Sequence, residues 1–309
     1  MTVGYNHPLF LLPFDHRHSY ISSMFQFDVP LMSSQRRAVI ESKHVIYDGF
    51  RCALGGELNP DTAGILVDEE FGAAILRDAS RRGYVTALST ERSGSAEFEF
   101  EYGSAFAAHI EAFQPTFAKA LVRYNPEGDV DLNARQTARL KQLSNYCRSV
   151  GQRFMFELLV PATQAQLDRS GADQDTYDRS MRPALMLQAI RALQDADIEP
   201  DIWKIEGLDR REDCEQVVAV ARREGRDDVG CIVLGRHADD EKVVSWLRTA
   251  ASVPGFIGFA VGRTTFWDAV SDYVKKRTTR GEAAARIALR YRKWARAFGG
   301  GRHLHSSAA

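Results

Sequence analysis

The chain has 309 residues, of which 44% are hydrophobic and 26% are charged, as is typical of a globular protein. Its 40 lysines and arginines nearly balance 41 aspartates and glutamates, which gives a formal net charge of −1. This balance argues against a nucleic-acid or membrane-surface partner that would be attracted by bulk charge. The length fits two small domains or one large α/β barrel, since such barrels typically need about 250 residues.

The four cysteines lie far apart and form no C-x-x-C pair, which argues against a disulfide framework and against a zinc site. We expect three of them in helices and one in a strand: Cys52, Cys147, Cys214 and Cys231. The apolar residues 9–14 have no basic segment before them and no small-residue cleavage site after them, so no signal peptide is expected. No apolar run approaches membrane-spanning length. These features predict a cytoplasmic protein.

Eight short apolar runs predict buried strands, and each is followed by a segment with helical spacing. The strands are expected at residues 9–14, 64–68, 85–91, 117–123, 154–160, 202–206, 230–234 and 256–261. The helices are expected at residues 34–54, 70–82, 97–113, 132–150, 177–196, 213–224, 239–251 and 266–273, and a long basic helix is expected at 281–298. Residues 45–47 could also be interpreted as a strand. The last residues, 299–309, begin with three glycines and are expected to form a disordered tail.

This alternation of strands and helices predicts parallel βαβ units. Eight such units fit a closed (β/α)8 barrel, the TIM-barrel fold, as one domain over residues 1–298 with an extra C-terminal helix. An open doubly wound sheet is the alternative, and it would place a glycine-rich nucleotide-binding turn after the first strand. The sequence has Asp-His-Arg-His at residues 15–18 instead, which favours the barrel.

A lysine lies in the middle of the apolar run 202–206. Because alternate side chains of a strand share a face, we expect Ile202, Lys204 and Glu206 on one face and Trp203 and Ile205 on the other. Buried strands of parallel sheets are normally rich in valine, isoleucine and leucine. A buried lysine commonly has a lowered pKa, which makes its amine a usable nucleophile, as in Schiff-base enzymes. Alternatively, the lysine stem is buried and its head pairs with a carboxylate.

Charged side chains also occur at the carboxyl ends of the other strands, where such barrels carry out their chemistry. The candidates there are Asp15, Arg17, Asp68, Glu91, Lys119, Arg123, Glu157, Lys204 and Glu206. Lys119, Glu157 and Lys204 stand out because each has apolar neighbours on its own strand. If they converge inside the barrel, their titrations are coupled and Glu157 can shuttle protons. The alternative is a buried ion pair that only fills space.

Two glycine–arginine pairs follow the seventh and eighth strands, Gly235 with Arg236 and Gly262 with Arg263. The loops after these two strands frequently form phosphate sites in such barrels. Glycine lets the backbone approach the anion, and Arg263 could bind it with two hydrogen bonds. Either pair alone is weak evidence for phosphate binding, since an arginine after a strand often lies on the rim. Together they predict phosphate binding.

The motifs at the strand ends resemble those of class I aldolases of the tagatose-bisphosphate and sulfofructose-phosphate type. They include ILVDEEFG at 65–72, ERSG at 91–94, WKIE at 203–206 and GRTTFW at 262–267. A similarity that extends nearly end to end is to the bacterial 2-deoxy-5-keto-gluconate-6-phosphate aldolase family, often fused to the inositol-pathway 5-dehydro-2-deoxygluconokinase. Its hallmarks are LPFDHR at 12–17, EFEFEYG at 97–103, LVRYNPEGD at 121–129, FMFELLVP at 154–161 and FIGFAVGR at 256–263.

The resemblance implies a role for each candidate residue. Lys204 would be the Schiff-base lysine, Glu157 the acid and base of carbinolamine dehydration, and Lys119 the residue that tunes the amine. Asp15 and Glu91 would contact substrate hydroxyls, and Gly235, Gly262 and Arg263 would hold the phosphate. The sequence departs from the family pattern at His18 and His237, where glycine is expected. Both histidines lie on loops at the catalytic mouth, and His237 could crowd a phosphate.

The implied reaction is cleavage of 2-deoxy-5-keto-gluconate 6-phosphate to dihydroxyacetone phosphate and malonate semialdehyde in inositol catabolism. The carboxylate of this substrate needs a cation, for which Arg123 and Arg17 are candidates because both lie at strand ends. No cofactor is expected, and the absence of two histidines at ligand spacing argues against a metal. Three alternatives stay open: an aldolase for another phosphorylated or sulfonated ketose, a non-catalytic sugar-phosphate-binding barrel, and an isomerase. A subunit contact through the basic C-terminal helix, and with it a homo-oligomer, also stays open.

Overall fold

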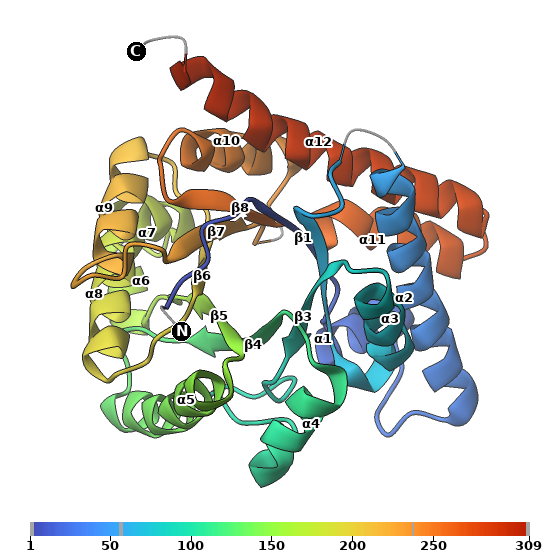
Figure 1. Cartoon of the computed structure of the whole chain (residues 1–309), viewed down its shortest axis with the longest axis horizontal. Coiled ribbons are helices and arrows are strands. Elements are labelled where there is room, and N and C mark those ends of the chain that lie inside the picture. Colours follow the sequence, from blue (N-terminus) through green and yellow to red (C-terminus); the bar gives the residue numbers. More distant parts are fainter. Residues whose placement is uncertain (1–2, 56–57, 237, 307–309) are drawn as a thin grey trace.

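The computed structural model of the protein describes residues 3–55, 58–236 and 238–306, without the side chains of 302–306. Eight parallel strands close into a barrel in which each strand pairs with the next and β8 pairs with β1. Helices surround the barrel on the outside (Figure 1). The predicted TIM barrel is therefore confirmed, and the open-sheet alternative is wrong.

All eight strands lie close to the positions predicted from their apolar runs. They are β1 (Leu9–Pro13), β2 (Ala63–Val67), β3 (Val85–Ser89), β4 (Phe117–Arg123), β5 (Arg153–Leu159), β6 (Ile202–Glu206), β7 (Gly230–Leu234) and β8 (Phe256–Ala260). Successive side chains along each strand face the helices and the barrel interior in turn. On β6, for example, Trp203 and Ile205 join the core beneath the helices, whereas Ile202 joins the core inside the barrel. The predicted division of this strand into two faces is confirmed.

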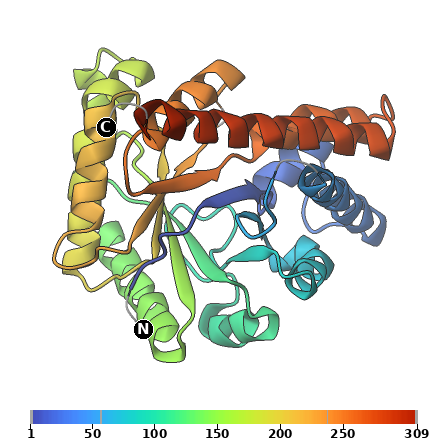
Figure 2. The same ribbon diagram turned by 45° about the horizontal axis from the view of Figure 1, so that its top comes forward.

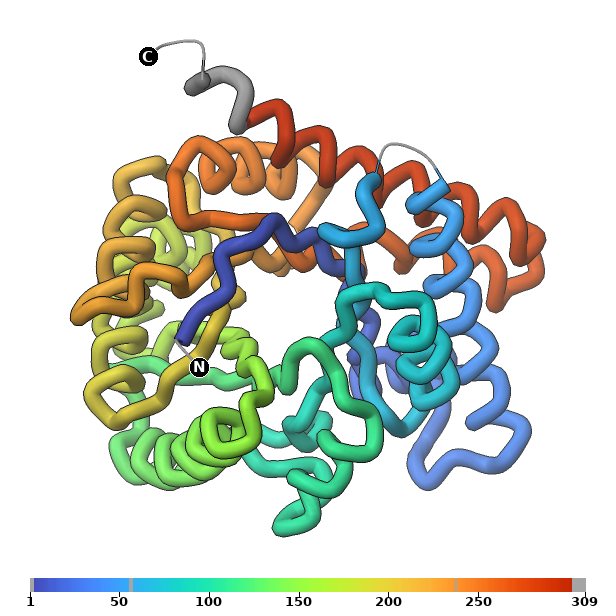
Figure 3. Tube along the Cα trace, in the orientation of Figure 1, coloured from blue at the N-terminus to red at the C-terminus, as the bar shows by residue number. Residues whose placement is uncertain are grey.

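The part of the barrel interior toward the amino-terminal ends of the strands is an apolar layer. It consists of Leu9, Leu11, Leu66, Ala87, Phe117, Met155, Ile202, Ile232 and Ile257, all buried. The N-terminal segment crosses this end of the barrel (Figure 3). Tyr5 packs edge-to-face on Phe117 with ring centroids 5.1 Å apart, and the Gly4 N–H donates to Asp201 Oδ1 at 2.8 Å. One end of the interior is thereby filled and closed.

The helices that cover the barrel agree in most cases with the predicted ones. They are α1 (His18–Tyr20), α2 (Ser33–Leu54), α3 (Glu69–Arg81), α4 (Phe106–Phe113), α5 (Val130–Val150), α6 (Gln164–Arg169), α7 (Gln174–Ser180), α8 (Arg182–Asp195), α9 (Arg211–Ala221), α10 (Asp240–Ala251), α11 (Arg263–Val274) and α12 (Arg280–Ser306). Asp68, Asp129 and Asp239 cap α3, α5 and α10 by accepting backbone N–H groups, which explains why these helices begin where they do. Three cysteines lie in helices and Cys231 lies in a strand, as predicted.

Two helix predictions are wrong in part. Residues 97–102 form a loop in which Phe100 makes an isolated antiparallel bridge with Glu91. A short 3-10 helix follows at Gly103–Ala105, where the φ of Gly103 is +52°, and α4 begins only at Phe106. Phe98 is buried in this loop, which explains the apolar character that suggested a helix. The single helix predicted at 177–196 is interrupted between α7 and α8, where Pro183 occupies the first turn of α8.

Helix α12 runs along α2, α10 and α11 on the outside of the barrel (Figure 2). Its Tyr291 is buried and donates a hydrogen bond to Phe10 O on β1 at 2.6 Å. The helix continues through the three glycines to Ser306, so the tail expected to be disordered is helical over 299–306, and 307–309 lie outside the described residues. Gly301 is buried, and a Cβ there would lie 2.8 Å from Ala251 Cβ, so this glycine permits close packing on α10. Within the described residues, no helix is long and apolar enough to cross a membrane.

Candidate active site

A cavity of about 370 Å³ opens at the carboxyl ends of the strands, opposite the apolar layer. The predicted site residues that line it are Asp15, Arg17, Glu91, Arg123, Glu157, Lys204, Gly235, Gly262 and Arg263. Lys119, the remaining predicted residue, is fully buried and lies within hydrogen-bond distance of three of these side chains. The structure thus brings all ten residues together at one end of the barrel.

Glu157 bridges the two lysines at the floor of the cavity. Its Oε1 lies 2.6 Å from Lys204 Nζ, and its Oε2 lies 2.8 Å from Lys119 Nζ. Glu157 and Lys204 occupy directly opposed positions on β5 and β6, so the strand register itself sets the first of these contacts. Burial acts to raise the pKa of Glu157, but the two ammonium groups outweigh it and hold the pKa below its usual value. Glu157 is therefore an ionised carboxylate beside the Lys204 amine.

Lys119 is surrounded by carboxylates on three sides. Besides Glu157, its Nζ lies 2.8 Å from Asp15 Oδ2 and 2.7 Å from Glu91 Oε1. Burial acts to lower the pKa of Lys119, but the three carboxylates together raise it. Burial acts to raise the pKa of Asp15, and Lys119 holds it well below its usual value. Lys119 therefore remains a cation, and Asp15, Glu91, Lys119, Glu157 and Lys204 form a charged layer above the apolar one.

The period of two along the strands explains how the sequence produces this charged layer. Lys119, Glu157 and Lys204 each come two residues after a member of the apolar layer, so they point into the same interior. Asp15 and Glu91 continue the interior-facing positions of β1 and β3 just beyond the ends of those strands. Five different strands therefore deliver one side chain each to the floor of the cavity.

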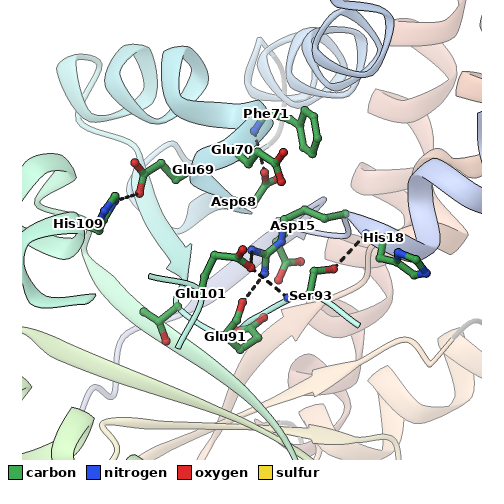
Figure 4. Close-up of polar contacts among 12 residues, drawn as sticks. Asp15, His18, Asp68, Glu69, Glu70, Phe71, Glu91, Ser93, Glu101 and His109 are labelled. Atoms are coloured by element: carbon green, nitrogen blue, oxygen red, sulfur yellow. Dashed lines mark hydrogen bonds and ion pairs between the residues drawn. The ribbon is translucent and has the colours of Figure 1, made fainter. Parts of the chain in front are cut away.

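Arg17 lines the cavity, but its guanidinium is already paired. Its guanidinium pairs with Glu101 at 2.5 Å and also donates to Glu91 O at 2.5 Å. Figure 4 shows Asp15, Glu91 and Glu101 side by side in this region. The backbone N–H of Ser93 donates to the same Glu101 carboxylate at 3.1 Å. Arg17 thus holds the loop after β3 against the turn after β1.

Arg123, at the end of β4, has an exposed side chain whose guanidinium lies 3.5 Å from Ser95 O. No ion pair joins it to a carboxylate of the described residues. Arg263, at the start of α11, likewise forms no ion pair with a described carboxylate, and it donates to Ser19 Oγ at 2.5 Å. Because β4 and β8 are separated by three strands in either direction around the closed barrel, these two cations lie on opposite sides of its mouth.

The two glycine–arginine pairs have different surroundings. Arg236 is held by Glu206 at 3.0 Å and by Asp178 of α7, so its charge is already balanced. A Cβ on Gly235 would lie 2.9 Å from the Val261 side chain, and one on Gly262 would lie 2.5 Å from Pro13 O. Both positions therefore need glycine for close packing between neighbouring strand ends. Only the second pair leaves an arginine without a carboxylate partner among the described residues.

Two residues of the site were not singled out from the sequence. His16 lines the cavity, and its Nδ1 is buried with no partner among the described residues. Burial lowers the pKa of His16 to about 3, so the ring is neutral. Lys43 of α2 is buried beneath the turn that contains Asp15 and His16. His18 is exposed and its backbone N–H donates to Ser93 Oγ (Figure 4), whereas His237 lies outside the described residues.

No cluster of three or more histidine, cysteine, aspartate or glutamate side chains in the described part of the chain is arranged to hold a metal ion. The polar groups that converge on the cavity are instead amines, guanidiniums, carboxylates and the His16 ring, and the two amines pair with the carboxylates. Such a set can form a covalent imine at Lys204, transfer protons through Glu157 and bind anions at the rim.

The closed barrel with this cavity at its carboxyl end has the TIM-barrel fold of the aldolases. The chain belongs to the family described as "uncharacterized protein conserved in bacteria (DUF2090)", which matches residues 4–299. It is also 24% identical over 269 residues to tagatose 1,6-diphosphate aldolase 1 of Streptococcus mutans serotype c (strain ATCC 700610 / UA159), covering 76% of this chain and 75% of that protein.

Two solved structures have the same fold at low sequence identity. Fructose-bisphosphate aldolase from Plasmodium falciparum, in complex with TRAP and an inhibitor, has a TM-score of 0.59 and 13% identity, covering 97% of this chain and 92% of that chain. Cgl0159 from Corynebacterium glutamicum has a TM-score of 0.55 and 17% identity, covering 95% of this chain and 88% of that chain. The protein is thus related in fold and distantly in sequence to aldolases, which are lyases.

Proposed function

We propose that the protein is a class I aldolase, with Lys204 as the residue that forms the Schiff base. The observation that carries this proposal is the bridge from Lys204 through Glu157 to Lys119, with Nζ–Oε distances of 2.6 and 2.8 Å. A nucleophilic amine needs a nearby group that accepts its protons, and Glu157 lies within reach. Lys119, kept cationic by three carboxylates, stabilises the ionised form of Glu157.

The steps that form the iminium have their groups in place in Lys204 and Glu157. Glu157 takes a proton from the Lys204 ammonium, and the free amine adds to the ketone carbon. The nitrogen then loses a second proton, and Glu157 passes both protons in turn to the former ketone oxygen, which leaves as water. The resulting iminium cation is the electron sink. A base removes the proton of the hydroxyl group on C3, two carbons from the ketone at C5. The C3–C4 bond then breaks, and its electron pair converts the iminium to an enamine. Protonation of the enamine carbon and addition of water release the ketone product and free Lys204. Asp15 and Glu91, at the cavity wall, contact the substrate hydroxyls.

The cations at the rim favour a substrate with an anion at each end. The phosphate binds at the start of α11, where Gly262 and Arg263 offer backbone N–H groups and a guanidinium, with Gly235 on the neighbouring strand end. Arg123 on the opposite side binds the far carboxylate, because Arg17 is already committed to Glu101. Lys204 on β6 lies between the two sides, two strands from each. This arrangement suits a phosphorylated keto sugar acid, and 2-deoxy-5-keto-gluconate 6-phosphate of inositol catabolism is the substrate we propose.

The relatives support the reaction class and the phosphorylated substrate. The Streptococcus mutans protein is named for a sugar diphosphate, and the Plasmodium falciparum protein is named for a sugar bisphosphate. The inositol-pathway substrate rests on the resemblance of the long sequence motifs at the strand ends. Cleavage of that compound between C3 and C4 gives dihydroxyacetone phosphate and malonate semialdehyde.

Borohydride reduction in the presence of dihydroxyacetone phosphate tests the proposal. We expect a reduced adduct in the intact mass of the protein and, after digestion, its location on Lys204. The Lys204→Met variant should form no adduct and should lose activity by at least about 10³-fold, because it lacks the nucleophile. Lys275→Met, on the outer α11–α12 connection, is the control for nonspecific reduction of a lysine.

An adduct on Lys204 with cleavage of a different phosphorylated or sulfonated ketose would keep the class and change the substrate. Phosphate-sugar binding without an adduct on a folded protein would overturn the Schiff-base mechanism and favour a non-catalytic sugar-phosphate-binding barrel.

A further inference from the structure

A third buried lysine, Lys43, holds the turn that carries Asp15. Lys43 lies on α2 and is 1% exposed. Its ammonium donates hydrogen bonds to Phe14 O at 2.9 Å and to His16 O at 3.1 Å, and it forms an ion pair with Asp68. An ammonium has three N–H donors, and these three partners use all of them.

The two carbonyl groups belong to the residues on either side of Asp15. Because both carbonyl groups are held, the position of the Asp15 backbone is restricted. From this position the Asp15 carboxylate reaches Lys119 Nζ at 2.8 Å. Strand β1 ends at Pro13, and one further backbone hydrogen bond, from Phe14 N–H to Leu66 O at 2.8 Å, continues its pairing with β2. Lys43 therefore fixes the part of the turn that the sheet no longer holds.

The partner of Lys43 is itself held in place. Asp68 is fully buried, and its Oδ1 accepts the backbone N–H of Phe71 at 2.8 Å as the N-cap of α3 (Figure 4). The rings of Tyr20 and Phe71 lie 5.9 and 5.5 Å from the ammonium and cover it. The ion pair thus connects α2 and the start of α3 to the Asp15 turn.

A gain in folding stability does not by itself explain the buried ion pair of Lys43 and Asp68. Removing two charges from water costs about as much as their attraction returns, and apolar replacements of a buried ion pair are often neutral or stabilising. An apolar side chain, however, cannot bind two carbonyls of a turn. Lys43 therefore fixes the position of the backbone around Asp15, which an apolar residue would not do.

We propose that Lys43 is a positioning residue of the active site, which places the Asp15 carboxylate against Lys119 by binding the carbonyls of Phe14 and His16. This role rests on the proposed aldolase function, in which Asp15 and Lys119 belong to the reacting cluster. A displacement of about 1 Å at such a group can lower a reaction rate on the order of 10²-fold. The effect of losing Lys43 should therefore be exerted through Asp15.

The test uses the double variant K43M/D68N, which removes both charges together. Methionine keeps the stem of the lysine, and asparagine keeps the oxygen that caps α3. The probe is dihydroxyacetone phosphate in D₂O, whose C3 hydrogen exchanges with solvent once the iminium forms. We expect the exchange rate, followed by NMR, to fall on the order of 10²-fold. K43Q carries the same expectation if the double variant does not fold.

The role through Asp15 is separated from a structural one by a mutant cycle. D15N should lower the exchange rate by a similar factor, and D15N/K43M/D68N should be no slower than D15N, because residues that act through one group are not additive. Factors that multiply in the triple variant would overturn the proposal. The control is R226M/E199Q, a partly buried ion pair of 2.7 Å on the loops before β6 and β7, which should exchange at the wild-type rate.

A crystal structure of K43M/D68N supplies a readout that does not depend on activity. We expect the Asp15 carboxylate to lie beyond hydrogen-bond distance of Lys119 in this variant. If it stays in place, the proposal is overturned whatever the exchange rate. Absence of both adduct and exchange in the wild type would instead contradict the aldolase function, and the position of Asp15 in the crystal would still decide the role of Lys43.

Discussion

The apolar layer and the charged layer inside the barrel are only two residues apart along a strand, yet they differ in chemical character. Phe117, Met155 and Ile202 lie in the apolar layer, and Lys119, Glu157 and Lys204 follow them in the charged layer. Both sets of side chains are buried, so burial itself does not distinguish them. Apolar side chains gain free energy by leaving water, whereas charged ones lose hydration and persist only because each ammonium meets a carboxylate. We therefore expect that the two layers can be perturbed separately, the apolar layer through stability and the charged layer through the proposed chemistry.

Glu157→Gln should have the largest effect and act on the charged layer alone. An amide of the same size cannot take a proton from Lys204, so we expect kcat to fall by about 10²- to 10⁴-fold. The measurement is steady-state cleavage together with the rate at which the borohydride-trapped adduct forms. Met155→Leu, on the same strand in the apolar layer, conserves volume, should cost less than about 1.5 kcal/mol of stability and should keep kcat. Equal losses of activity in the two variants would contradict the separation.

Ile202→Ala should act in the opposite way. The side chain is fully buried, so its truncation should lower the free energy of unfolding by about 2–5 kcal/mol. Lys204→Met, two residues further on, should be neutral or stabilising, because Glu157 keeps its ion pair with Lys119. Urea denaturation measures both. The Lys204 adduct should still form in folded Ile202→Ala protein, and its loss there would mean that the apolar layer also shapes the chemistry.

His16 should make the free energy of unfolding of the protein depend on pH. Burial lowers its pKa from 6.5 to about 3, so between these values the ring is neutral in the folded protein and protonated in the unfolded one. The unfolded state then binds the additional proton, so stability falls as pH falls, by at most about 1.4 kcal/mol per pH unit. Between pH 6.5 and about 4.5 the wild type should lose up to about 2.7 kcal/mol that His16→Gln retains.

Urea denaturation at a series of pH values compares the two slopes, with His18→Gln, an exposed histidine at the start of α1, as the matched control. The same slope for wild type and His16→Gln would show that the ring of His16 is protonated in the folded protein.

The charged layer was predictable because it depends on a local rule. A strand alternates its faces, so Lys204 and Glu206 could be assigned to one face before any neighbour was known. Strand order then brings the carboxyl ends together in any barrel of this kind. The residues Lys119 and Glu157 were found in the same way, as charges inside apolar runs.

The contribution of Lys43 was not predictable by that rule. A lysine on a 22-residue helix is ordinarily at the surface, and its burial depends on where the turn after β1 passes. The same limit applies to the two glycine–arginine pairs. Their sequences are alike, but Arg236 pairs with Asp178, a residue 58 positions away on α7, whereas Arg263 donates to the hydroxyl of Ser19 and lies over the ring of Trp267. Such differences arise from long-range packing, which local sequence patterns do not predict.

The contact between α12 and β1 has a consequence for how the protein is made. Strand β1 completes its pairing only with β8, the last strand, and Tyr291 near the end of the chain bonds to Phe10. The ribosome synthesises β8 and α12 after the other seven strands, so the second edge of β1 stays uncovered until β8 has emerged. The turn with Asp15 directly follows this strand. The start of this turn is therefore held on both edges of β1 only once β8 has been synthesised.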